Sequence, residues 1–465
     1  MKKYLALLTV LAFTTLQSGW AGALGLKSIS SPDGSIEISG QQASNETDFA
    51  PADDHRGSVV TRVRLGVNMD VTDDVRGRIE AVRACDPAGA NVLYGNGKPE
   101  TVANEEANIG IQNAYLDIDG LLGLDSFRVG RQYVGRPGDL IVYFGPLNDD
   151  ILNVTALDSL SITKKWWKLD ITGVTGKIVD NTGVPGVTDT NADVAGDQNV
   201  SWITLNSDTL IPDMKVPLEF GVYQYTNTGA TAATNDNMTL AVYDLRAGYT
   251  LMDGAVNLGA EYAMNGGQRN GAGPGGSNVD NKGTALLFNA MYDDKEVGWG
   301  AHLKYADASG DDPTETNSTS KDSSFRDIAS DFRFGEILSN SNRLATACPL
   351  GSGPGLDTGN FGCGLNVINI GGYYKLPVGN NKLTALADYY MVSVNEVANS
   401  IDDGVGTEID LTLQYAHSKD VTGAIGYATF SPDKGFINQY AANANLSDDP
   451  VTKLFAKLMV KWGGQ

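Results

Sequence analysis

The segment 59–83 constrains the fold of this chain more than any other. It reads VVTRVRLGVNMDVTDDVRGRIEAVR, and apolar and charged side chains alternate on both sides of a turn at Thr72-Asp73-Asp74. A period of two predicts a β-hairpin whose two faces meet different environments. In a soluble sandwich the apolar face packs on another sheet, whereas in an outer-membrane barrel it meets lipid and the polar face lines a water-filled lumen. One hairpin leaves both alternatives open.

The rest of the chain favours the barrel. Alternating segments recur and give about 18 strands. Short turns alternate with long loops rich in Gly, Asn and Asp, for example 180–198, 265–282 and 307–365. Outer-membrane barrels have this asymmetry, and sandwiches do not require it. We therefore predict an all-β protein, a transmembrane antiparallel β-barrel of about 18 strands with short periplasmic turns and long extracellular loops.

The first 23 residues have the pattern of a secretory signal peptide. Lys2-Lys3 is the basic end, 5–16 is the apolar segment, and Ala21-Gly22-Ala23 offers a small-residue cleavage site. Later in the chain, no stretch approaches the roughly 20 apolar residues of a membrane-spanning helix. We expect residues 24–465 to form a single barrel domain in the outer membrane of a Gram-negative bacterium, with 307–365 as a candidate plug or lid.

Charge and sequence position predict the partners. The formal net charge of −22 argues against nucleic acid. Asp-Asp pairs lie mostly in turn-like segments, where they either are simply solvated or bind divalent cations that bridge to anionic lipopolysaccharide. The expected partners are outer-membrane lipid and lipopolysaccharide, small hydrophilic solutes, and the barrel-assembly machinery, which would engage the C-terminal strand 453–462.

Three cysteines are too few for a disulfide framework. Cys348 and Cys363 flank a Gly/Pro-rich segment, and export makes a disulfide between them plausible. Such a bond would close a loop rather than create the fold. Cys85 is then left over, unless it pairs with one of the other two.

The alternation predicts which basic side chains face the lumen. If Val63, Leu65 and Val67 face lipid, then the intervening arginines face inward. Arg131 has the opposite parity and faces inward only if a bulge or the strand end turns it. The candidate pore-lining and solute-binding residues are Arg62, Arg64, Arg76, Arg78, Arg128, Arg131, His302 and Lys304.

Two interpretations of these basic residues are open. A ring of arginines inside a low-dielectric wall concentrates anions and binds carboxylates in bidentate fashion, which predicts a conduit for anionic or carboxylated solutes. Alternatively, the arginines pair with inward acids such as Asp70 and Glu80 and only hold the lumen together.

Three phrases resemble the alginate-export type of outer-membrane barrel: Gly130-Arg131-Gln132, then Gly138-Asp139-Leu140, then Ala156-Leu157-Asp158-Ser159-Leu160. The resemblance implies an 18-stranded monomeric barrel with a lumen rich in Arg and Lys for a polyuronate chain. The intervening segment 141–155 departs from the tryptophan-containing phrase of that family, which bears on alginate as the solute.

Residues for catalysis or metal binding are scarce. The only histidines are His55, His302 and His417, and none lies in a Ser-His or His-Glu-x-x-His setting. We therefore predict no enzyme, no metal and no cofactor. The predicted function is a porin for passive diffusion of small hydrophilic, anionic or carboxylated solutes. The alternative is a structural or adhesive outer-membrane barrel with a plugged lumen.

Overall fold

The computed structural model of this chain describes residues 26–45, 55–85, 91–92, 99–100, 109–147, 154–179, 197–211, 216–227, 238–270, 278–311, 321–338, 364–378, 382–396, 403–433 and 449–463. The predicted signal peptide, residues 1–23, lies outside the described residues, as do Cys348 and Cys363. The predicted cleavage and the predicted disulfide therefore remain predictions.

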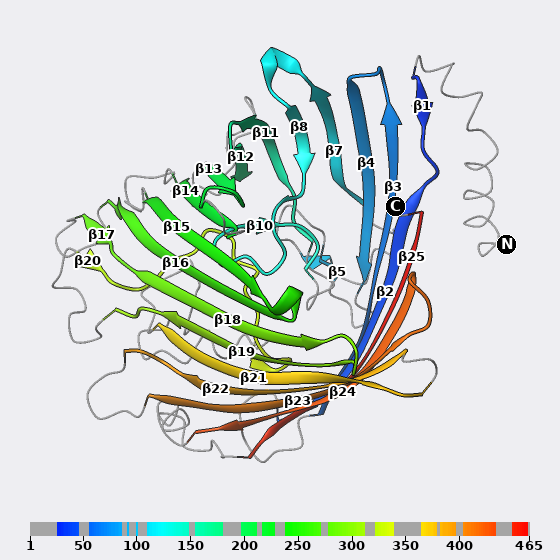
Figure 1. The fold of residues 1–465 in the computed structure, drawn as a ribbon, viewed down its shortest axis with the longest axis vertical. Helices are drawn as coiled ribbons and strands as arrows, with labels where there is room; N and C mark the ends of the chain where they lie inside the picture. Colours follow the sequence, from blue (N-terminus) through cyan, green and yellow to red (C-terminus); the bar gives the residue numbers. More distant parts are fainter. Residues whose placement is uncertain are drawn as a thin grey trace.

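Eighteen antiparallel strands form one closed sheet, which confirms the predicted fold class (Figure 1). The first half of the ring contains β2 (Asp33–Ser44), β3 (His55–Asp70), β4 (Val75–Cys85), β7 (Gly110–Asp119), β8 (Ser126–Gln132), β11 (Leu157–Trp166), β12 (Leu169–Val179), β13 (Gln198–Ser207) and β14 (Leu218–Asn227). The second half contains β15 (Met238–Leu251), β16 (Val256–Arg269), β18 (Thr284–Asp294), β19 (Trp299–Ala308), β21 (Leu365–Leu376), β22 (Leu383–Ser393), β23 (Gly404–Ala416), β24 (Val421–Pro432) and β25 (Val451–Trp462).

Short elements complete the described structure. Three of them extend the main sheet: β1 (Ser28–Ile29), β17 (Val279–Asn281) and β20 (Lys321–Asp322). Two small separate sheets contain β5 (Asn91–Val92) with β6 (Pro99–Glu100), and β9 (Val134–Gly135) with β10 (Tyr143–Phe144). Two 3-10 turns, η1 (Leu121–Gly123) and η2 (Met252–Gly254), lie between strands.

The sheet closes where β25 pairs with β2. Their antiparallel register runs without a break from Gly34 opposite Trp462 to Ser44 opposite Thr452. Figure 1 shows these strands, blue and red, side by side. Closure removes the free edges of the sheet, so the backbone N–H and C=O groups along both strands are paired.

Connections on the two ends of the barrel differ in length, as the sequence predicted. Strands β11 and β12 are joined by Trp167 and Lys168 alone, and β3 and β4 by residues 71–74. Some of these tight turns place large residues in the left-handed region, including Leu122 at φ 54° and Trp167 at φ 56°. That conformation costs an L-residue about 1–2 kcal/mol.

The two faces of the sheet differ in chemistry. At positions of opposite parity along a strand, an apolar side chain is exposed on the outside while a polar one is buried inside. The exposed members include Leu65, Ile79, Leu116, Leu245, Ile370 and Leu454, and the buried members include Arg62, Glu80, Asp117, Asp244, Asn369 and Lys453. An apolar exterior around a charged interior is the pattern of a barrel that sits in lipid.

Two segments fold into the interior of the barrel, and we name them the inner loop (134–147) and the inner strap (321–338). They hydrogen bond to each other, with Tyr143 N–H donating to Ala329 O at 2.7 Å and Asp331 N–H donating to Asp139 O at 2.9 Å. The inner loop is tied to one wall because Arg62 Nη1 donates to Leu147 O at 2.8 Å. The inner strap is tied to the opposite wall through Asn265 of β16, which accepts from Arg326 N–H at 2.7 Å.

Apolar contacts hold both segments in place. Leu140, Ile141 and Phe325 pack in one buried cluster with wall residues of β11 to β16, and Ile337 and Leu338 pack in a second cluster with residues of β21 to β25. Burying one such side chain stabilises a fold by about 1.5–3 kcal/mol. The inner wall therefore presents apolar side chains to parts of both segments and charged side chains elsewhere.

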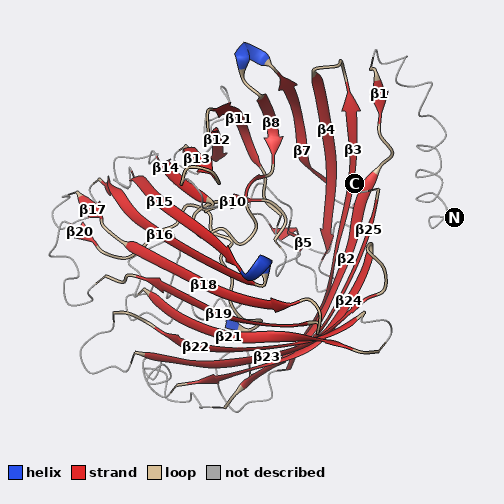
Figure 2. Cartoon of the chain, in the orientation of Figure 1, coloured by secondary structure: helices blue, strands red, loops and turns tan. Residues whose placement is uncertain are grey.

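Strands dominate the described structure (Figure 2). No helix among the described residues is long and apolar enough to cross a membrane.

Candidate functional site: the charged lumen

The arginines predicted from the opening hairpin lie on neighbouring strands, and each contacts a carboxylate. Arg62 of β3 forms an ion pair with Glu37 of β2, and both side chains are buried. Arg64, two residues further on the same face, donates to Ser35 Oγ at 3.1 Å and lies 3.9 Å from Glu37. Alternation along β3 therefore places both arginines inside the barrel, as predicted.

Arg78 of β4 is the most extensively bonded of these residues. Its two terminal nitrogens donate to the two oxygens of Asp33, each at 2.8 Å, and Nη2 also donates to Glu80 at 2.6 Å. Of the two acids proposed as partners from the sequence, Glu80 does pair with an arginine. Asp70 instead accepts a hydrogen bond from Ser28.

Two further arginines on this side of the lumen are paired with β7. Arg76 donates to both oxygens of Asp119 at 2.9 Å, and this pair is about half exposed. Arg128 of β8 donates to Asp117 at 2.8 Å and stacks on the Tyr115 ring at 4.4 Å. Each of the five arginines thus contacts an acid of β2, β4 or β7, which matches the second interpretation of the sequence.

Arg131 does not share the inner face with these five arginines, and its prediction as a pore-lining residue was wrong. It lies directly opposite Asp158 on β11 and donates to that carboxylate at 2.9 Å. The pairing of β8 with β11 has no register shift, so Arg131 shares the outer face with Val129, which is 42% exposed. No bulge turns it inward.

The second predicted group lies on another part of the wall. His302 of β19 hydrogen bonds through Nε2 to Asp388 at 2.7 Å and to Asn369 at 3.0 Å. Lys304 extends from the same face of β19 and is exposed. No described carboxylate lies within ion-pair distance of its ammonium group, so Lys304 differs from the paired arginines.

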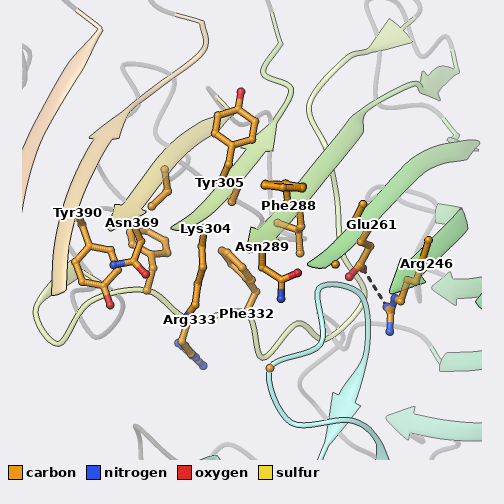
Figure 3. A pocket seen from close by; sticks show the side chains of 18 residues that line it. Arg246, Glu261, Phe288, Asn289, Lys304, Tyr305, Phe332, Arg333, Asn369 and Tyr390 are labelled. Atoms are coloured by element: carbon orange, nitrogen blue, oxygen red, sulfur yellow. Dashed lines mark ion pairs between the residues drawn. The ribbon is translucent and has the colours of Figure 1, made fainter. Parts of the chain in front are cut away.

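Lys304 lines a cavity of about 360 Å³ between the wall and the inner strap. Figure 3 shows Lys304 and Asn289 extending from the wall toward the strap, where Phe332 and Arg333 lie. Arg333 is 3.6 Å from Asp331, a neighbour on the strap. Tyr305, Asn369 and Tyr390 also line this cavity. Cationic, amide and aromatic groups therefore converge on one space.

Arg246 of β15 marks the end of this cavity and was missed by the sequence analysis. It donates to both oxygens of Asp139 on the inner loop, at 2.8 and 3.1 Å, and lies 3.1 Å from Glu261. The same alternation that located Arg62 places Arg246 and Asp244 inside. The contact with Asp139 could not be found in this way, because it joins a strand to a loop far away in the chain.

A second cavity, of about 410 Å³, lies on the other side of the inner loop. Arg128, Tyr133, Arg136 and Glu219 are among its lining residues. Arg136 forms an ion pair with Glu219 and lies 3.9 Å from Asp139. The inner loop therefore contributes to two hollows that are both lined by charged side chains, Gly138 to the first and Asp139 to the second.

The far end of the inner strap carries an acidic anchor. Glu336 accepts hydrogen bonds from Lys457 at 2.7 Å and from Lys453 at 3.3 Å, both on β25. Burial raises the pKa of Glu336, but the two ammonium groups outweigh burial and hold that pKa below its usual range. Among the described residues, no group of three or more His, Cys, Asp or Glu side chains could hold a metal ion.

Comparisons with known proteins concern the fold. No protein-family model matches the chain, and no curated protein matches it in sequence. Among solved structures, a BenF-like porin from Pseudomonas fluorescens Pf-5 is 12% identical with a TM-score of 0.53, over 94% of this chain and 99% of that one.

Two proteins from Pseudomonas aeruginosa are similar to about the same extent. OccK10 (OpdN) is 14% identical with a TM-score of 0.53, over 93% of this chain and 99% of that one. OccK5 (OpdH) is 13% identical with a TM-score of 0.51, over 92% of this chain and 98% of that one. Closed by the pairing of β2 with β25, this chain therefore has the fold of an eighteen-stranded porin barrel.

Proposed function

We propose that this protein is an outer-membrane porin through which small hydrophilic solutes diffuse passively, with preference for solutes that carry a carboxylate or another anionic group. The observation that carries the proposal is the closed barrel with an apolar exterior and a charged lumen, in which Lys304 faces an open cavity and has no ion-pair partner among the residues that the structure describes. A low-dielectric wall strengthens the attraction between an uncompensated cation and an incoming anion.

We assign this preference to Lys304 rather than to the arginines of β3, β4 and β8. Each of those five arginines already contacts a carboxylate, so the positive charge of its guanidinium is largely offset. Among the described basic residues that line the 360 Å³ cavity, Lys304 is the one with no carboxylate within ion-pair distance, and Asn289 and Asn369 can donate hydrogen bonds to the same anion.

The wider setting follows from this function. The barrel lies in the outer membrane, contacts lipid and lipopolysaccharide with its apolar face, and is inserted by the barrel-assembly machinery acting on β25. It works as a channel without catalysis or cofactor. Alginate is not proposed as the solute, because the similar solved structures are OccK5, OccK10 and a BenF-like porin, and none of these names refers to alginate.

Ion selectivity in planar bilayers tests the proposal. The wild-type protein is expected to give steady conductance steps with anion preference, measured as the reversal potential in a salt gradient. Lys304→Gln removes the uncompensated charge and is expected to shift that potential toward cation preference. Lys382→Gln is the matched control, because Lys382 lies in an exposed turn and donates to His417 O. An equal shift in both variants would contradict the assignment to Lys304.

A plugged structural barrel is the second candidate, and the inner strap favours it. The strap and inner loop hydrogen bond to each other and together cross the lumen, from Arg62 of β3 to Asn265 of β16 on the opposite wall. Replacing residues 321–338 with a short Gly/Ser linker separates the two functions. A plug predicts that wild-type bilayers carry almost no current and that the deletion opens the pore, whereas a porin conducts before the deletion is made.

A further inference from the structure

The end of the inner strap is held to the wall by ionised groups. Lys453 Nζ donates to the backbone oxygen of Glu336 at 2.7 Å and to its carboxylate, and Lys457 Nζ donates to the other carboxylate oxygen. Both ammonium groups also lie over the ring of Phe455, between them on β25. Lys453 is buried, and Glu336 is the one carboxylate among the described residues that forms an ion pair with it.

A second carboxylate accepts hydrogen bonds from the backbone of the strap. Glu408 of β23 accepts the N–H groups of Glu336 and Ile337, each at 2.7 Å, and of Leu338 at 3.0 Å. Gly335 makes this approach possible, because it has φ 71° and a Cβ there would overlap the carboxylate of Glu408. Three successive N–H groups that donate to one carboxylate favour its ionised form.

The remaining titratable and charged groups at this end are few. Asp410 of β23 accepts from Glu336 N–H at 3.0 Å, and Tyr390 of β22 lies beside Gly335. Arg333, on the strap itself, lies near Asp331. The neighbouring residues of β21 and β24, such as Val367 and Phe430, are apolar. The polar attachment thus depends on three carboxylates and two lysines.

Protonation of either Glu336 or Glu408 weakens the attachment of the strap to the wall. A neutral Glu336 loses the attraction of both lysines, and a neutral Glu408 is a poorer acceptor for the three N–H groups. The lysines lower the pKa of Glu336 from its ordinary value of 4.5, so its contribution is present at neutral pH and is lost as the pH falls through the lowered value. The apolar contacts of Ile337 and Leu338 do not change with pH.

We propose that residues 332–338 are an acid-sensitive latch, which fastens the inner strap to β23 and β25 at neutral pH and releases it from the wall when Glu336 is protonated. Phe332 and Arg333 line the 360 Å³ cavity, so release of the latch changes the cavity that contains Lys304. The inference rests on the proposed channel function. Acid widens the lumen on this side without unfolding the barrel, whose strand pairing does not involve these groups.

Single-channel conductance between about pH 7 and about pH 3 tests the latch. Wild-type conductance is expected to rise at the acid end, and Glu336→Gln is expected to show the acid value already at neutral pH. Glu296→Gln is the matched control, since Glu296 is an exposed glutamate in the turn between β18 and β19. Heat-modifiable migration in gels reports whether each barrel is folded.

Labelling gives a readout that does not depend on current. In a chain with its three cysteines replaced by serine, Leu338→Cys is expected to react slowly with an impermeant maleimide and to react faster when combined with Glu336→Gln. Equal conductance of wild type and Glu336→Gln at all pH values, with equal labelling, would overturn the latch while leaving the porin intact. Absence of conductance at every pH, with folded barrels, would instead refute the porin.

Discussion

The ion pair between Arg62 and Glu37 should contribute far more to stability than the pair between Arg76 and Asp119. Side chains of the first pair are 2% and 6% exposed, and those of the second are 54% and 45% exposed. Removing one partner of a buried pair leaves an uncompensated charge and costs about 3–5 kcal/mol. Removing one partner of an exposed pair costs about 0–1 kcal/mol. Arg62 also bonds to Leu147 O, which would lose its donor.

Urea unfolding in lipid vesicles, followed by tryptophan fluorescence, measures the difference. Arg62→Met should lower the free energy of unfolding by about 3–5 kcal/mol and Arg76→Met by less than about 1 kcal/mol. Arg62→Met combined with Glu37→Gln should recover part of the loss, since the buried charge is then removed. Equal effects of the two single variants would refute the reasoning that the lumen arginines stabilise the barrel in proportion to their burial.

Two backbone positions give further predictions. Gly267→Ala should destabilise the barrel by more than about 1 kcal/mol, because Gly267 has φ 89° and an added methyl group would overlap Thr239 O. Gly40→Ala is the control, because the atom nearest to the added methyl group is 3.7 Å away, and this variant should be nearly neutral in the same assay. Leu122→Gly should stabilise the folded state by about 0.5–1 kcal/mol, because Leu122 is exposed and lies at φ 54°. A lower urea midpoint for this variant would contradict the claim that the backbone of Leu122 is strained.

Strands, their pairing and most of their facing directions could be predicted from the sequence. Alternation is a local property, so Arg62, Arg64 and Arg78 could be placed inside from their neighbours alone. Arg131 was named as a pore-lining candidate although its parity along β8 predicted the outer face. It does lie on the outer face. The same logic extends to Arg246 on β15, which the sequence analysis passed over.

Contacts of the inner segments could not be predicted. Asp139 bonds to Arg246, and Glu336 to Lys453 and Lys457, across more than one hundred residues. Loops carry no periodicity that identifies such partners, and nothing in 307–365 distinguishes an inward segment from an external one. The alternation also fails on the inner wall where Val367 and Phe430 meet Ile337, because the strap supplies an apolar neighbour in place of water.

The pairing of β2 with β25 has a consequence for how the molecule is made. The first long strand to be synthesised, β2, pairs with the last, β25, so all the strands between them must be in place before the seam can close. Until then two unpaired edges exist, and hydrocarbon offers no water to satisfy their N–H and C=O groups. Any route into a bilayer therefore has to shelter both edges of a nearly complete cylinder and join them in its final step.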